Sequence, residues 1–450
     1  MNIIIVGCGS VGRTLAQKLN DDGNAVTVID MSSAKIQKLT NRLDVMGVVG
    51  NGATYTVQRE AGIDTADLFI AVTNSDELNL LCCMIAKKEG HCQTIARVKS
   101  PEYSQETAYL KEELGLAMVI NPEYAAAEEI ARILRFPSAT KIETFAKGKV
   151  ELVTFKLDKE SVLVGLSVKD VMLKYRADVL ITTVERGDDT FIPNGDFVFE
   201  EKDVVTISGS VKNAYDFFVK IGKKSSHIKK TIVVGDGVIT HYLCEILSRL
   251  GISLTVVAKD MTVCEELCAK WDKVTVLQGE ATDYALLKEE GVAAADAVVA
   301  VTDGDEENIL LSLFAKDAGC RKLITKINRV DYGNVVEKLE LDTIICPRNI
   351  TAAQILRYVR AKQNTRGSDM QTLYSVNDTE VEAAEFIVKE DSPIIGKPLR
   401  ELQLEKDVLI ASIIRGKMII TPRGNDIIEK GDDVVVVCKY PIYDIAEVLK

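Results

Sequence analysis

The sequence has few histidines and no long apolar run, and both shortages restrict what it can do. Only three of its 450 residues are histidine, which leaves little material for histidine-based acid–base chemistry or metal binding. No apolar stretch approaches the roughly 18 residues that a membrane-spanning helix needs, so we expect no such helix. Gly7, Gly9 and Gly12 interrupt the apolar start of the chain, and a secretory signal peptide is therefore not expected.

The sequence also has fewer basic than acidic residues. The net charge is −12 and the isoelectric point is near 5.1, which argues against a nucleic-acid-binding protein with a basic face. The ten cysteines are scattered, and several lie in apolar stretches, such as Cys82, Cys83 and Cys438. This distribution favours buried free thiols in a reducing compartment over disulfides or a zinc site. We therefore expect a cytoplasmic protein without a metal centre.

What the sequence does contain is a repeat of half its own length. The segment AGIDTADLFIAVTNSDELNLL at 61–81 aligns with EGVAAADAVVAVTDGDEENIL at 290–310. Further along, FIPNGDFVFEEKDVVTISG at 191–209 aligns with IITPRGNDIIEKGDDVVVVC at 419–438. The repeating unit is too long for a solenoid, so the pattern indicates a duplicated multi-domain unit.

The first part of each repeat alternates strands with helices. Apolar runs predict strands at 2–6, 25–29, 45–49, 67–72 and 93–98, and amphipathic segments predict helices at 11–20, 32–42, 54–61, 76–89 and 122–135. This alternation predicts an α/β fold with a doubly wound parallel sheet, that is, a Rossmann-like domain. The second part of each repeat has short β-rich runs separated by Gly/Asp turns, which predicts a small α+β domain.

Four domains follow from this pattern. We predict a first Rossmann-like domain at 1–138 and its small α+β domain at 139–222, then a second Rossmann-like domain at 228–362 and its small domain at 371–450. The polar segments KKSSHIKK and AKQNTRGSDM are expected to be linkers.

A glycine-rich turn follows the first predicted strand and opens the first predicted helix. In that context Gly7 permits a tight turn, Gly9 lets a pyrophosphate approach the backbone, and Gly12 lets the helix pack closely. The helix N-terminus would add free N–H groups and partial positive charge. The expected dinucleotide-binding turn consists of Gly7, Cys8, Gly9, Ser10, Val11 and Gly12.

Asp30, at the end of the second strand, is expected to accept hydrogen bonds from ribose hydroxyls. Its charge favours NAD(H), or another adenosine nucleotide with free hydroxyls, over NADP. Thr73 and Asn74 end the fourth strand and are further candidates, as is Arg97 at the end of the fifth. Each has an alternative role: Asp30, Thr73 and Asn74 as helix caps, and Arg97 in an ion pair. Asn51 is expected either to face the adenine of the ligand or to have a role in its own turn.

The second repeat lacks several of these groups. Thr240 stands where the first repeat has Gly12, Ala258 replaces Asp30, and Lys326 replaces Arg97. Lys259, beside Ala258, leaves open a changed preference for phosphate. We expect a weak or empty second nucleotide site.

These motifs resemble the TrkA family of regulatory subunits of bacterial and archaeal Trk potassium-uptake systems, which are built from RCK/KTN domains. The resemblance rests on VGCGSVG, the 61–81 block, ARV at 96–98 and IPNGDFVFEEKDVV, and it covers essentially the whole chain. It implies that the NAD-binding positions are Gly7 to Val11, Asp30, Thr73, Asn74 and Arg97, with ATP or ADP as alternative ligands. It also implies a ring-shaped tetramer, peripheral on the inner face of the membrane, that gates a membrane-embedded potassium-translocating subunit.

Two other functions compete with this one. An NAD-dependent dehydrogenase would need a proton-transfer residue in a substrate domain, and the small domains contain no histidine. We therefore expect no enzyme activity and no catalytic residue. The chain could also be a nucleotide-sensing subunit of a different transporter or channel.

Overall fold

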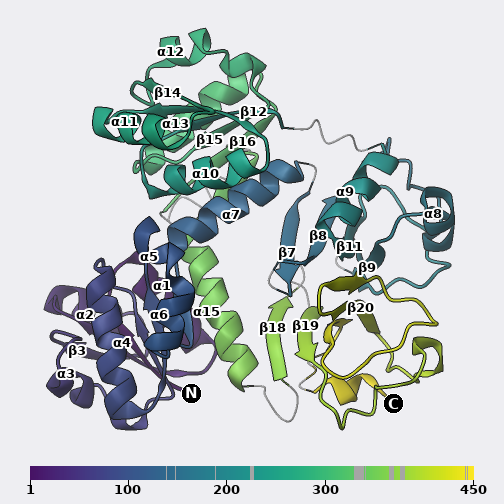
Figure 1. The fold of residues 1–450 in the computed structure, drawn as a ribbon, viewed down its shortest axis with the longest axis horizontal. Coiled ribbons are helices and arrows are strands. Elements are labelled where there is room, and N and C mark those ends of the chain that lie inside the picture. Colours follow the sequence, from purple (N-terminus) through teal and green to yellow (C-terminus); the bar gives the residue numbers. More distant parts are fainter. Residues whose placement is uncertain are drawn as a thin grey trace. The chain divides into compact units, whose positions relative to one another are not determined.

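The chain folds into two compact units, each of which combines corresponding parts of both repeats (Figure 1). The computed structural model describes all residues except 138, 147, 188, 223–227, 329–338, 340, 364–368, 376–380, 441 and 443. One unit comprises Met1–Leu134 and Ile228–Leu356, and the other comprises Arg135–His227 and Arg357–Lys450. Residues 223–227 of the first predicted linker and residues 364–368 of the second lie outside the described residues.

The first unit contains two six-stranded parallel sheets with the same strand order. The first sheet has the order β3-β2-β1-β4-β5-β6 and the second has the order β14-β13-β12-β15-β16-β17, which confirms the predicted doubly wound fold. The strands of the first are β1 (Asn2–Val6), β2 (Ala25–Asp30), β3 (Met46–Val49), β4 (Leu68–Ala71), β5 (Gln93–Arg97) and β6 (Met118–Ile120). Those of the second are β12 (Lys230–Val234), β13 (Ser253–Ala258), β14 (Val274–Gln278), β15 (Ala297–Ala300), β16 (Lys322–Lys326) and β17 (Thr343–Ile345).

Helices connect these parallel strands, as the sequence predicts. The first repeat contributes α1 (Ser10–Asp21), α2 (Ser33–Thr40), α3 (Tyr55–Glu60), α4 (Asp76–Gly90), α5 (Pro101–Gln105), α6 (Thr107–Glu113) and α7 (Pro122–Arg135). The second contributes α10 (Val238–Arg249), α11 (Met261–Lys270), α12 (Tyr284–Glu289), α13 (Asp305–Asp317) and α15 (Pro347–Gln363). Helix α1 buries Val11, Leu15 and Leu19 at a spacing of four residues, which is the apolar stripe of a helix packed on a sheet.

In the first unit, the sheet β1–β6 with its helices is the first Rossmann-like lobe, and the sheet β12–β17 with its helices is the second. Helix α7 joins the two lobes, although it follows the first sheet in sequence. Its buried side chains Ala127, Ile130 and Leu134 belong to one core cluster with Leu243 and Leu247 of α10. The last helix of the first lobe therefore packs on the second lobe, as Figure 1 also shows. Because this apolar surface is buried between the lobes, it stabilises their pairing.

The second unit consists of two five-stranded antiparallel sheets. Their orders are β10-β9-β11-β8-β7 and β18-β19-β22-β20-β21. The strands are β7 (Lys141–Phe145), β8 (Val150–Lys156), β9 (Leu180–Arg186), β10 (Asp189–Phe191), β11 (Val204–Ser210), β18 (Asp369–Ser375), β19 (Glu382–Ile387), β20 (Val408–Arg415), β21 (Met418–Ile420) and β22 (Asp433–Cys438), with helices α8 (Val168–Tyr175) and α9 (Val211–Lys220). Phe145 and Leu152 share a core cluster with Ala383 and Val435, so the two sheets pack on one another.

Candidate functional site

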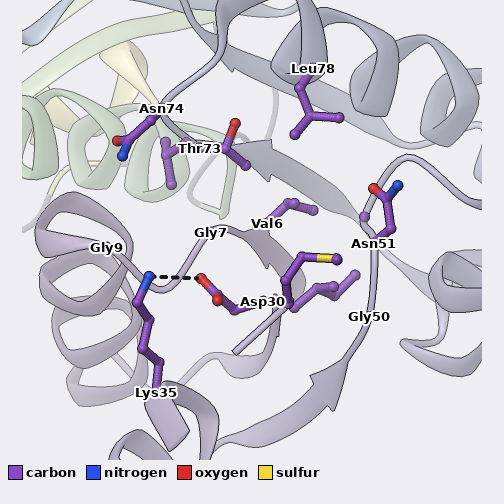
Figure 2. Close-up of a pocket in the computed structure, with 14 residues that line it drawn as sticks. Val6, Gly7, Gly9, Asp30, Lys35, Gly50, Asn51, Thr73, Asn74 and Leu78 are labelled. Carbon is purple, nitrogen blue, oxygen red and sulfur yellow. Dashed lines mark ion pairs between the residues drawn. The ribbon is translucent and has the colours of Figure 1, made fainter. Parts of the chain in front are cut away.

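A cleft of about 180 Å³ lies at the carboxyl edge of the first sheet (Figure 2). In doubly wound sheets this edge, where the strand order reverses, is the usual ligand site. Five of the predicted site residues line it: Gly7, Gly9, Asp30, Thr73 and Asn74. The residues that complete its lining are Val6, Ile29, Met31, Lys35, Gly50, Asn51, Gly52, Val72 and Leu78.

The glycine-rich turn has the geometry that the motif predicts. Gly7 has φ of +105°, and a Cβ there would lie 3.0 Å from the backbone of Val72. A Cβ on Gly12 would lie 1.8 Å from the carbonyl oxygen of Gly7, so only glycine lets α1 approach the turn so closely. A Cβ on Gly9 would meet nothing within 4 Å. Gly9 is therefore not required by protein packing, and its open side faces the cleft that it lines.

Asp30 connects the second strand to the glycine turn. Its Oδ2 accepts a hydrogen bond from the Cys8 N–H at 2.7 Å, and its Oδ1 accepts one from the Ser32 N–H at 2.9 Å. Lys35 Nζ lies 3.8 Å from Oδ2 (Figure 2). The helix that follows, α2, is capped by Ser32, whose side chain accepts from the Lys35 N–H. The alternative role of Asp30 as the cap of α2 is therefore wrong.

Of the remaining residues of the turn, Ser10 is exposed and Cys8, Val11 and Gly12 are buried. Ser10, Val11 and Gly12 form the first turn of α1. Burial raises the pKa of the Cys8 thiol, and the neighbouring Asp30 carboxylate raises it further. The thiol is therefore neutral near pH 7 and is not an activated nucleophile.

Thr73 is fixed by a residue that the sequence alone did not single out. The Thr73 N–H and hydroxyl both donate to Oδ1 of Asn79, at 2.8 and 2.7 Å. The Asn79 amide nitrogen donates in turn to the carbonyl of Arg97 at 3.0 Å. Asn79 is completely buried, so this single side chain holds the ends of β4 and β5 together beneath the cleft.

The capping role considered for Thr73 and Asn74 belongs instead to Ser75. Its side chain accepts a hydrogen bond from the Leu78 N–H at 3.2 Å at the start of α4. Asn74 is left to line the cleft. Asn51 lines the cleft too, but its Oδ1 accepts from the Ala53 N–H at 3.0 Å, which supports the predicted turn role.

Arg97 is held in an ion pair rather than at the lining of the cleft. Its Nη2 lies 2.8 Å from Oε1 of Glu123, at the start of α7. The exposed side-chain fractions are 13% and 22%, so the pair is only partly solvated. This is the alternative that the sequence left open for Arg97, and it connects the end of β5 to the helix that packs on the second lobe.

The lining side chains that were missed at the sequence level include Met31, Lys35 and Leu78. Met31 directly follows Asp30 and is 73% exposed, although methionine usually lies in a core. An apolar residue at that place, directly after the strand-end acid, is the signal that could have marked it. Lys35 lies in the first turn of α2, where only the folded structure shows its proximity to Asp30.

In the second lobe, different residues occupy the positions that correspond to the glycine turn and to Asp30. Thr240 replaces Gly12, and its hydroxyl donates to the Gly235 carbonyl at 2.8 Å. Asp236 instead places a carboxylate on the turn itself, and its Oδ2 accepts a hydrogen bond from the Asp260 N–H at 3.2 Å. An acid at that point repels phosphate. Ala258, at the strand end, is buried and offers no acceptor side chain.

Lys259 and Lys326, the two lysines of the second lobe that could attract a phosphate at the corresponding positions, both have acidic partners. Lys259 lies 3.0 Å from Glu280 in an exposed ion pair. Lys326 lies 3.5 Å from Asp303 and also donates to the Thr302 carbonyl at 3.1 Å. Neither lysine is therefore left as an unpaired cation for a phosphate.

Comparisons with known proteins agree with the fold and the repeat. A family model described as the TrkA-N domain matches residues 3–122 and 231–347, and one described as the TrkA-C domain matches 152–222 and 383–441. The chain is 35% identical over 444 residues to "Trk system potassium uptake protein TrkA homolog 1" of Methanosarcina mazei, covering 97% of each chain.

Two solved structures share the fold at 16% sequence identity. One is titled "Crystal Structure of the GsuK RCK domain", with a TM-score of 0.64 over 97% of this chain and 92% of that one. The other is titled "GsuK channel bound to NAD", with a TM-score of 0.65 over 97% of this chain and 76% of that one. The matched domains and the identity over nearly the full length show that the chain belongs to the TrkA family.

Proposed function

We propose that the chain is a regulatory subunit of a Trk-type potassium-uptake system. In this proposal it binds NAD(H), or an adenine nucleotide such as ATP or ADP, in the cleft of the first lobe and does not consume it. The observation that supports this most strongly is the combination of a family relationship over nearly the whole chain with a glycine-lined cleft at the sheet edge.

The residues present fit a dinucleotide. The open side of Gly9 provides room for a pyrophosphate against the backbone, and α1 begins there without a side-chain cap on its free N–H groups. Such N–H groups bind phosphate oxygens and favour negative charge. The Asp30 carboxylate, held in place by the Cys8 and Ser32 N–H groups, has lone pairs left for ribose hydroxyls.

Bound nucleotide would supply charge and hydrogen-bonding groups, and the chain would respond by favouring one arrangement of its lobes. A ligand shifts such an equilibrium only by its difference in affinity between the two arrangements. In this proposal Arg97 couples nucleotide binding to the arrangement of the lobes, because its partner Glu123 lies on the helix that packs on the second lobe. A phosphate that drew Arg97 toward the cleft would weaken that ion pair.

The proposed partner is a membrane-embedded potassium-translocating subunit, with this chain as a homo-oligomeric ring, expected to be a tetramer, at the inner face of the membrane. The names of the curated relatives support the transport system. Among the residues that the structure describes, no helix is both long and apolar enough to cross a membrane.

An NAD-dependent dehydrogenase is the less favoured reading. The side chains that line the described cleft include two ionisable groups, Asp30 and Lys35, and no histidine, tyrosine or cysteine. General acid–base catalysis at a dehydrogenase usually relies on His, Lys or Tyr placed beside the reacting carbon. Lys35 lies instead beside Asp30, at the proposed ribose position.

The test is potassium flux through vesicles that contain the membrane subunit, with and without the purified chain and NADH. We expect the chain to copurify with that subunit and to make the flux depend on NADH, with no NADH oxidised. Steady NADH turnover with a hydroxy-acid or keto-acid substrate would instead support a dehydrogenase. Binding of NADH without any association with a potassium-transporting subunit would favour a different transporter or channel.

A further inference from the structure

A second cavity, of about 400 Å³, lies between the two Rossmann-like lobes of the first unit. Small-molecule sites typically have volumes of about 300–1,000 Å³ and combine apolar walls with a few convergent polar groups. This cavity shares no lining residue with the cleft of the first lobe. Its polar lining comes from the β6–α7 junction and from α7, α10 and α15, and consists of Asn121, Tyr124, Glu128, Tyr242, Glu245 and Gln354.

Two tyrosines form an aromatic wall in this cavity. The rings of Tyr124 and Tyr242 meet edge to face, with centroids 5.1 Å apart and planes at 83°. The Tyr242 hydroxyl accepts from the Asn121 amide at 2.8 Å and donates to the Lys99 carbonyl at 3.1 Å. Since these bonds join the two lobes, the ring of Tyr242 has a fixed position, and the wall does not depend on a ligand to form.

The charge of the cavity is negative. Glu245 is paired with Arg249 on its own helix at 2.7 Å, and that arginine is 75% exposed. Glu128 lies close enough to Tyr124 to raise the pKa of its phenol. Within the described part of the chain no lysine, arginine or histidine forms an ion pair with Glu128. Among the described residues, Glu128 is therefore a carboxylate without an ion-pair partner at the wall of the cavity.

The phenol of Tyr124 stays protonated near neutral pH. Burial raises its pKa to about 12, with Glu128 and then Glu245 as further causes. The phenol is therefore uncharged and adds no charge to the cavity.

The repeat shows that the corresponding helix of the second lobe forms without these groups. Helix α15 is the counterpart of α7, and the aligned prolines Pro122 and Pro347 open both helices. At the positions that match Tyr124 and Glu128, α15 carries Asn349 and Ala353. The aromatic and acidic groups thus occur on one copy of the helix, and they lie together at a cavity.

We propose that this cavity binds a small organic cation, such as a quaternary ammonium or an alkylamine. The ammonium group would lie against the Tyr124 and Tyr242 rings, with the Glu128 carboxylate as its counter-ion. Aromatic faces next to a carboxylate are the usual surroundings of bound organic ammonium groups. The described residues offer no cluster of three metal-ligating side chains, which disfavours a divalent metal there. Because both lobes supply walls, occupancy would hold them in one arrangement.

The test compares a cation with a neutral molecule of the same shape, by titration calorimetry on the full chain at fixed ionic strength. The probes are choline and its uncharged analogue 3,3-dimethylbutan-1-ol, with putrescine and tetramethylammonium as further cations. We expect choline to bind once per chain and the alcohol to bind at least about tenfold more weakly. Equal affinity of choline and the alcohol, or no binding by all three cations, would overturn the proposal.

A pair of variants locates the site. Glu128→Gln keeps the shape of the side chain and should weaken choline binding at least about tenfold, whereas Glu112→Gln, at an exposed position of α6, should leave it unchanged. Unchanged choline binding by a folded Glu128→Gln variant would refute the assignment. NADH titrated in parallel separates this proposal from nucleotide binding, since the two sites share no residue and either can fail alone.

Discussion

The two Rossmann-like lobes share their framework and differ in the chemistry at the sheet edge. In both, a buried asparagine fixes the end of the fourth strand: Thr73 donates to Asn79, and Thr302 donates to Asn308 by its N–H and hydroxyl at 2.9 Å. Each asparagine also donates to the carbonyl at the end of the next strand at 3.0 Å. These shared contacts therefore serve the fold.

Other groups at the sheet edge differ between the two lobes. Gly12 and Asp30 of the first lobe correspond to Thr240 and Ala258 of the second, and the acid has moved to Asp236 on the turn. Both lobes fold with the same strand order, so neither Gly12 nor Asp30 is needed to build a sheet of this kind. Gly12 is explained by the close packing of α1 on the turn, whereas the exposure of Asp30 to the cleft supports its proposed role in binding a ligand.

The largest effect should come from Gly12→Ala. The new Cβ would lie 1.8 Å from the Gly7 carbonyl oxygen, so α1 must move, and we expect a loss of about 3 kcal/mol in the free energy of unfolding. The matched change Thr240→Ala removes one hydrogen bond and should cost about 1 kcal/mol. Urea unfolding measures both. A Gly12→Ala variant as stable as the parent would contradict the close packing described here.

Asp30→Ala should have the next largest effect, on affinity. It removes the carboxylate that orders the Cys8 and Ser32 N–H groups and that would bind ribose, so NADH should bind about 30-fold more weakly, or by about 2 kcal/mol. Asp236→Ala is the counterpart in the second lobe and should leave NADH affinity unchanged. Calorimetry that showed equal losses in both variants would break the distinction between the lobes.

Gly9→Ala should weaken NADH binding about tenfold by obstructing the approach of a pyrophosphate. Both Gly9 and its counterpart Gly237 have extended backbone angles, and a Cβ on either would meet nothing within 4 Å. Stability should therefore be unchanged in Gly9→Ala and Gly237→Ala alike, as thermal melts will show. If Gly237→Ala weakened NADH binding as much as Gly9→Ala, the second lobe would also be an NADH-binding site.

The smallest effect concerns Arg97. Glu123→Gln removes its ion-pair partner and leaves the guanidinium available to a phosphate, so NADH should bind about threefold more tightly. The matched change is Asp303→Asn, which removes the partner of Lys326 and should leave NADH affinity as it is. Unchanged or weaker NADH binding in Glu123→Gln would show that Arg97 has no part in the site.

Much of this architecture could be predicted because it depends on local patterns. The parallel sheets follow from the strand–helix alternation, and the turn geometry follows from Gly7 and Gly12, whose roles are set by φ and by steric fit. The position of Asp30 follows from its place at the end of a strand. The family relationship was visible in the 61–81 block and is confirmed over nearly the full chain.

What could not be predicted depends on contacts between distant segments. Nothing local marks Arg97 as the partner of Glu123, since that pair forms only when α7 begins beside the end of β5. The packing of α7 on the second lobe and the cavity at Tyr124 and Tyr242 likewise require two lobes in contact. Asn79 reads as an ordinary helix residue until its buried position beneath Thr73 is known.

The stoichiometry of NADH binding to the intact chain tests the central claim most directly. Titration calorimetry should show one high-affinity molecule per chain, because Gly9 and Asp30 line the cleft of the first lobe, whereas the second lobe has Ala258 in place of Asp30 and Thr240 in place of Gly12. Two sites of equal affinity, or no binding at all, would contradict the account.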